Sequence, residues 1–79
     1  MSKFTLYPNP TRGSINIDLG ERLTNLKTTL TNSLGQVIIT KEYLSTDFIR
    51  LDIDEPKGIY FLQLQTENGA IITKKILKE

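Results

Sequence analysis

Apolar and polar residues alternate along much of this chain with the period of two that is typical of β-strands. In residues 14–19, isoleucine and leucine occupy every second position and the residues between them are polar. The alternation returns in residues 47–53, where Ile49, Leu51 and Ile53 form the apolar set. Each run predicts a half-buried antiparallel strand that turns its branched side chains towards a core.

Residues 58–78 predict two longer strands joined by one tight turn, because β-branched and aromatic residues flank an Asn-Gly pair. We expect a three-residue loop, residues 67–69, with Gly69 in the left-handed conformation. This loop places apolar residues opposite apolar residues, namely Leu64 opposite Ile72 and Tyr60 opposite Ile76. It also leaves Lys74 on the core side, either at the rim of the sheet or turned outward by a further bulge.

The rest of the pattern predicts short strands at residues 3–7, 26–32 and 36–43. They are separated by a polar connection at 20–25, a short link at 44–46 and turns. The segment Tyr7-Pro8-Asn9-Pro10 is expected to serve mainly as a rigid turn, because proline removes ladder donors. With about seven strands and no helical pattern, the chain is predicted to be all-β, a small antiparallel β-sandwich. A closed barrel is the alternative that the pattern leaves open.

Composition narrows the possible functions. A chain of 79 residues forms one domain, and 38% hydrophobic residues supply a thin core without an enclosed catalytic cavity. The chain has neither cysteine nor histidine, which excludes thiolate chemistry and the commonest general base and metal ligand. The net charge of +1 gives no indication of nucleic-acid binding. We therefore predict no enzyme, no catalytic residues and no cofactor.

Carboxylates gather at Asp52, Asp54 and Glu55, but no calcium-binding loop pattern follows them, so we predict no metal site. No apolar run reaches the roughly 20 residues of a membrane helix. The opening residues also lack the apolar stretch of a signal peptide, so we expect any export signal to lie on preceding sequence and Met1-Ser2 to be an added start.

Two groups of surface residues are candidates for binding. The strand faces predict that Tyr7, Phe48 and Phe61 point outward, where they either contact a ligand or pack on cross-strand neighbours. Near the end of the chain, three lysines form the one local concentration of charge: Lys74, Lys75 and Lys78. Lysines on an edge strand protect the sheet from edge-to-edge aggregation, which is the alternative to a receptor contact.

Several motifs in a fixed order then resemble a known family. They are YPNP (residues 7–10), LGQV (34–37), PKGIY (56–60), Asn68-Gly69 and a Lys-Lys-apolar-apolar-Lys ending. The series resembles the type A C-terminal sorting domain of the type IX secretion system, from Phe4 to Lys78. The resemblance implies an immunoglobulin-like sandwich that forms a single C-terminal sorting domain, residues 3–79, excised from a larger secreted precursor.

The resemblance also implies the partners and the route. An N-terminal cargo domain would precede this one in a precursor that passes through the periplasm to the cell surface or the medium. Outer-membrane translocon components would read the domain, and a surface sortase-like peptidase would remove it. The residues implied in recognition are Pro56, Gly58, Tyr60, Gly69, Lys74, Lys75 and Lys78. The alternative is an immunoglobulin-like binding or spacer module of a surface protein that contacts carbohydrate or protein.

Overall fold

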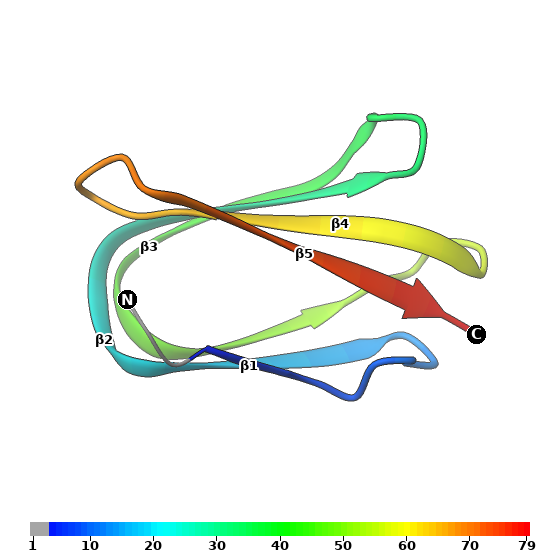
Figure 1. Cartoon of the computed structure of the whole chain (residues 1–79), viewed down its shortest axis with the longest axis horizontal. Coiled ribbons are helices and arrows are strands. Elements are labelled where there is room, and N and C mark those ends of the chain that lie inside the picture. The colour runs from blue at the N-terminus through cyan, green and yellow to red at the C-terminus, as the bar shows by residue number, and fades with distance from the viewer. Residues whose placement is uncertain (1–3) are drawn as a thin grey trace.

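Five antiparallel β-strands form two packed layers in the computed structural model, which describes residues 4–79 (Figure 1). The strands are β1 (Thr5–Tyr7), β2 (Ser14–Asn32), β3 (Val37–Asp52), β4 (Gly58–Gln65) and β5 (Ile71–Lys78). The first layer contains β1, the first part of β2 and the last part of β3. The second contains the first part of β3, the last part of β2, β4 and β5, in that order. The predicted β-sandwich is confirmed, and the predicted start of the first strand at Lys3 lies outside the described residues.

The prediction of seven strands is wrong, because β2 and β3 each continue from one layer into the other. The segments expected to be connections, residues 20–25 and 44–46, belong to β2 and β3. Figure 1 shows both strands curving together at the same end of the sandwich. Each strand therefore replaces two predicted strands and their connection.

The bend in β2 follows from residues that adopt positive φ angles. Gly20 has φ 77° and Asn25 has φ 50°, a region open to glycine and tolerated by asparagine. Between Asp18 and Leu23 the register with β3 shifts, so that extra residues of β2 lie on the outside of the bend. At this bend Arg22 contacts β3 through an exposed ion pair with Asp47 at 3.7 Å.

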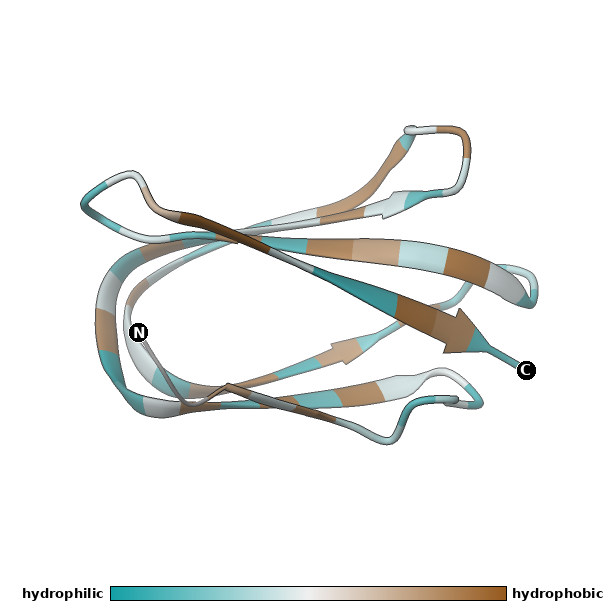
Figure 2. Cartoon of the chain, in the orientation of Figure 1, coloured by the Kyte–Doolittle hydropathy of each residue, from teal (hydrophilic) through white to brown (hydrophobic). Residues whose placement is uncertain are grey.

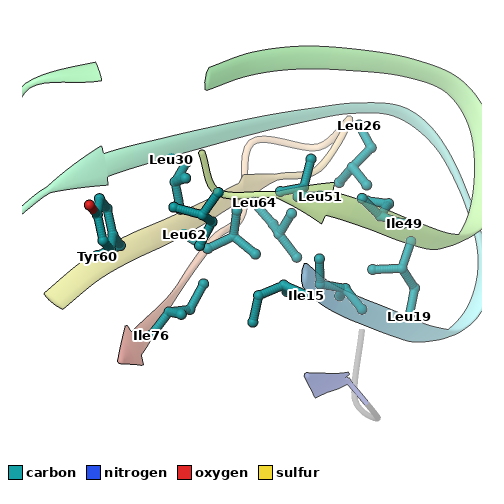
Figure 3. Close-up of a cluster of buried hydrophobic side chains, with 12 residues drawn as sticks. Ile15, Leu19, Leu26, Leu30, Ile49, Leu51, Tyr60, Leu62, Leu64 and Ile76 are labelled. Carbon is teal, nitrogen blue, oxygen red and sulfur yellow. The ribbon is translucent and has the colours of Figure 1, made fainter. Parts of the chain in front are cut away.

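The core lies between the layers and consists of the residues on the predicted inward faces (Figure 3). Apolar and polar positions alternate along the strands (Figure 2), which gives each layer one apolar face. The buried hydrophobic residues are Ile15, Ile17, Leu19, Leu26, Leu30, Ile49, Leu51, Ile53, Tyr60, Leu62, Leu64 and Ile76. Among Val37, Ile38 and Ile39, where the sequence left the inward face open, Val37 is exposed and the other two are half-buried.

The β4–β5 hairpin has the predicted register. Leu64 pairs with Ile72 and Tyr60 with Ile76, and Gly69 has φ 91° in the three-residue loop. The ladder runs from Gly58↔Lys78 to Gln65↔Ile71 without a register shift, so no bulge turns Lys74 outward. Instead Lys74 lies exposed at the rim, with its ammonium 5.4 Å from the centroid of the Phe4 ring. This distance fits a cation–π contact.

Candidate functional site

The seven residues implied in recognition lie along the β4–β5 hairpin and the turn that precedes it, but they do not form one cluster. Pro56, Gly58, Tyr60 and Lys78 gather where the hairpin begins and ends. Gly69 lies at the opposite end, in the loop. Lys74 and Lys75 lie between these two ends, on β5.

At the first end, Tyr60 and Lys78 hold the turn between β3 and β4. Tyr60 is 4% exposed, and its hydroxyl donates a hydrogen bond to the carbonyl oxygen of Pro56. The ammonium of Lys78 donates to the carbonyl oxygens of Ile53, at 2.7 Å, and of Glu55. Hydrogen bonds from a charged donor are stronger than those between neutral groups. Both side chains therefore stabilise the fold, and Lys78 is half-buried instead of free at the surface.

Lys74 and Lys75 differ from Lys78 because both are exposed. Lys74 contacts the Phe4 ring from the inner side of β5. Lys75 lies on the outer face, in register with Phe61 of β4, and within residues 4–79 its ammonium has no hydrogen-bond or ion-pair partner. These two cations are thus available to a partner on either side of the strand.

The segment after β1 covers part of the outer edge of β5, a contact that the sequence analysis missed. The side-chain amide of Asn9 donates to the carbonyl oxygen of Lys75 at 2.9 Å and accepts from the backbone N–H of Leu77 at 3.0 Å. The backbone of Thr11 then donates to the Leu77 carbonyl at 2.9 Å and accepts from the Glu79 N–H at 2.8 Å. The YPNP segment is therefore more than a turn: Asn9 and Thr11 form what we call the edge cover.

One feature of the sequence is consistent with the edge cover once the structure is known: an asparagine lies between two prolines. An asparagine amide offers the same donor and acceptor pair as a peptide group, and the flanking prolines fix the backbone on both sides of it. Thr11 is 1% exposed, and its hydroxyl donates to the Ser14 carbonyl at 2.6 Å. These contacts hold the cover in place against β5.

The exposed aromatic residues do not form one binding platform. Tyr7, Phe48 and Phe61 are exposed as predicted. Tyr7 on β1 and Phe48 on β3 belong to the first layer, whereas Phe61 on β4 belongs to the second. The three rings therefore do not lie on one common face to which a carbohydrate chain could bind.

An open groove of about 790 Å³ lies between the bend of β2 and the loop of the hairpin. Leu23 and Ile72 give it an apolar part, and Thr24 bridges it by donating to a Glu67 carboxylate oxygen at 2.5 Å. Among residues 4–79 no three carboxylates gather into a group suited to a metal ion. The described part of the chain also has no helix long and apolar enough to cross a membrane.

One comparison with known proteins identifies a family, and another identifies a solved structure of similar fold. The family model described as "Secretion system C-terminal sorting domain" matches residues 5–79. A crystal structure of a DUF3244 family protein from Bacteroides vulgatus, with an immunoglobulin-like β-sandwich fold, is similar at a TM-score of 0.83. The two sequences are 15% identical over 96% of this chain and 84% of that chain, so the likeness shows an immunoglobulin-like fold and nothing further. None of the curated proteins matches the sequence.

Proposed function

Since the chain belongs to the family of secretion system C-terminal sorting domains, the sorting domains of the type IX secretion system, we propose that it addresses a cargo protein to the outer-membrane translocon of that system. The observation that carries the proposal is the family match over residues 5–79, which includes every strand of the fold. The domain contributes a folded surface to this task and no chemistry of its own.

The proposed route has three steps. The cargo precedes the domain in a precursor that crosses the periplasm, the translocon binds the domain, and a sortase-like peptidase at the cell surface removes it. A receptor that binds unrelated cargo proteins must recognise a feature that their sorting domains share. The sorting signal is therefore expected to be a domain that folds independently of the cargo.

Within this proposal the seven recognition residues take two roles. Lys74 and Lys75 are the contacts for the receptor, because both ammonium groups are exposed. The others act through the shape of the hairpin: Tyr60 and Lys78 hold the turn that contains Pro56 and Gly58, and Gly69 permits the loop.

A fusion experiment tests the proposal. The whole chain is attached to the C-terminus of an unrelated passenger that carries a periplasmic signal peptide, in a host with a type IX system. We expect the passenger to reach the cell surface or the medium. A matched host without the translocon should retain the same fusion in the periplasm.

A fusion that folds and stays in the periplasm of the competent host, while that host exports its own cargo, would refute the proposed function. It would favour the alternative, an immunoglobulin-like binding or spacer module. A binding module would also work at any position in a protein, so transfer of the domain to the N-terminal side of the passenger gives a second comparison.

A further inference from the structure

The outer edge of β5 is covered along only part of its length. In an antiparallel pair, alternate residues direct their N–H and C=O groups to the partner strand and the others direct them away. The edge cover bonds outward groups of Lys75, Leu77 and Glu79, so the alternation turns the groups of Thr73 and Ile71 outward as well. Five outward groups are left: the N–H of Lys75 and both groups of Thr73 and of Ile71.

None of these five groups has a hydrogen-bond partner within residues 4–79. The cover ends at Lys75 because the chain turns away there: Pro8 has no N–H to donate, and Tyr7 pairs with Asn16 in the other layer. An unpaired row of backbone groups is a template for a further strand. The chain itself already uses the adjoining part of this edge, where Thr11 forms a parallel bridge with Lys78.

The side chains beside these groups have a charge pattern. On the outer face Ile71 is 54% exposed and Lys75 is exposed as well. On the inner side Ile72 lines the groove and Lys74 lies over Phe4. Along the strand, the uncovered edge is thus apolar at its start and cationic on both faces at its end.

We propose that residues 71–75 of β5, here called the free β5 segment, bind an extended segment of a type IX secretion component by strand addition. Main-chain hydrogen bonds supply the affinity in such a complex, and side chains at alternate positions supply the specificity. The matching segment has apolar side chains beside Ile71 and Ile72 and carboxylates beside Lys74 and Lys75. This inference rests on the proposed function, since it names the surface that the secretion machinery reads.

A second copy of this chain is a poorer occupant of the same edge. The sequence of β5 is IITKKILK, which contains no carboxylate. If two β5 strands paired in parallel, lysines would lie beside lysines. If they paired antiparallel, no lysine would have a carboxylate beside it. The charges therefore favour a partner with acidic side chains.

The test uses the passenger fusion and two substitutions at one position. Thr73→Pro removes an outward N–H, which an edge strand tolerates because that group has no partner in the sheet. Thr73→Val is the matched control, since it keeps the N–H and nearly the same side-chain volume. We expect Thr73→Pro to slow export about tenfold, the effect of one lost hydrogen bond that leaves its acceptor unpaired. Thr73→Val should export at the wild-type rate.

A second arm reverses the charges. Lys74→Glu with Lys75→Glu should slow export by at least as much, whereas Lys41→Glu, an exposed lysine of β3 that is remote from β5, should not. Thermal melting of each isolated domain checks that the variants fold. If Thr73→Pro does not fold, Ile71→Pro removes another of the free donors and takes its place.

The outcomes are separable. If the wild-type fusion is not exported, the proposed function fails. If the wild type is exported and folded Thr73→Pro is exported equally fast, strand addition at the free β5 segment is overturned. Loss of export on charge reversal alone would also overturn it, because it would leave a charge contact without a backbone one. A wild-type domain that elutes as a dimer, with a monomeric Thr73→Pro variant, would assign the edge to self-association and overturn the proposal as well.

Discussion

Lys78 offers the sharpest test of the structure, because the sequence alone presents it as one of three equivalent surface lysines. Its ammonium reaches across the open end of the sandwich, from β5 in one layer to the end of β3 in the other. There it satisfies the carbonyl oxygens of Ile53 and Glu55. Ile53 is buried, and its N–H donates to the Gly13 carbonyl at 2.7 Å, so this end of β3 is fixed at both backbone groups.

These contacts determine how much the substitution Lys78→Gln should lower the free energy of unfolding. Lys78→Gln removes the charge and shortens the side chain, so that two charge-assisted hydrogen bonds are lost. Such bonds contribute about 1.5–3 kcal/mol each when they are shielded from water. Since Lys78 is only half-buried, water compensates for part of the loss. We expect the free energy of unfolding to fall by about 2 kcal/mol in total.

Thermal unfolding of the isolated domain, followed by circular dichroism, measures this difference. A loss of about 2 kcal/mol in a domain of this size lowers the melting temperature by about 8–16 °C. Lys75→Gln is the matched control, because its ammonium has no hydrogen-bond or ion-pair partner within residues 4–79 and surface substitutions usually stay within about 0.5 kcal/mol. If the two variants melt within about 2 °C of each other, Lys78 does not join the layers and our reasoning is refuted.

Three further predictions concern the core, the turn before β4 and the edge cover. Ile17→Ala and Leu51→Ala should each lower the free energy of unfolding by about 2–5 kcal/mol, measured by urea denaturation; wild-type midpoints would contradict the inward faces. Tyr60→Phe should cost about 1 kcal/mol, the hydrogen bond to the carbonyl of the preceding turn, and Tyr60→Ala about 3–5 kcal/mol; equal melting temperatures would contradict the packing role of the ring. Asn9→Ala should speed hydrogen exchange at the Leu77 amide, whose bond to the Asn9 side chain is lost; unchanged exchange would show that this bond does not protect the amide.

The elements that could be predicted from the sequence are those in which the polarity of each residue matches its burial. The apolar residues of the first part of β2 and of the last part of β3 alternate with polar ones, and they are buried as expected. The hairpin register also followed from local information. The Asn-Gly pair restricts the loop length, and only one register places Leu64 and Tyr60 opposite apolar partners.

The continuity of β2 and β3 could not be predicted from the sequence, because the side chains at the bend are mostly exposed and show no alternation of apolar and polar residues. Gly20, Glu21 and Arg22 of β2 are all exposed, as are Leu44 and Ser45 of β3. A strand that crosses from one layer to the other has no apolar face at the crossing, so its sequence resembles a polar loop. Pairing with β3 on both sides of the bend, up to Asp18↔Phe48 and again from Leu23↔Thr46, keeps the chain extended.

The edge cover and the role of Lys78 depend on contacts between residues far apart in the sequence. Asn9 and Lys75 are 66 residues apart, and Lys78 and Ile53 are 25 apart. No local pattern indicates such pairs. The lysine ending is typical of an exposed edge strand, and only the structure separates its exposed members from the half-buried Lys78.

These long-range contacts have a consequence for the proposed address. The free β5 segment begins where the edge cover ends, and the cover is in place only when Asn9 and Thr11 have met residues 75–79. Lys78 must also have reached the end of β3. Without the cover, residues 71–75 would stay uncovered, and the outward groups of Lys75, Leu77 and Glu79 would become free as well. The edge cover therefore sets how far along β5 an added strand can pair: it restricts pairing to residues 71–75 and keeps residues 77–79 for the chain itself.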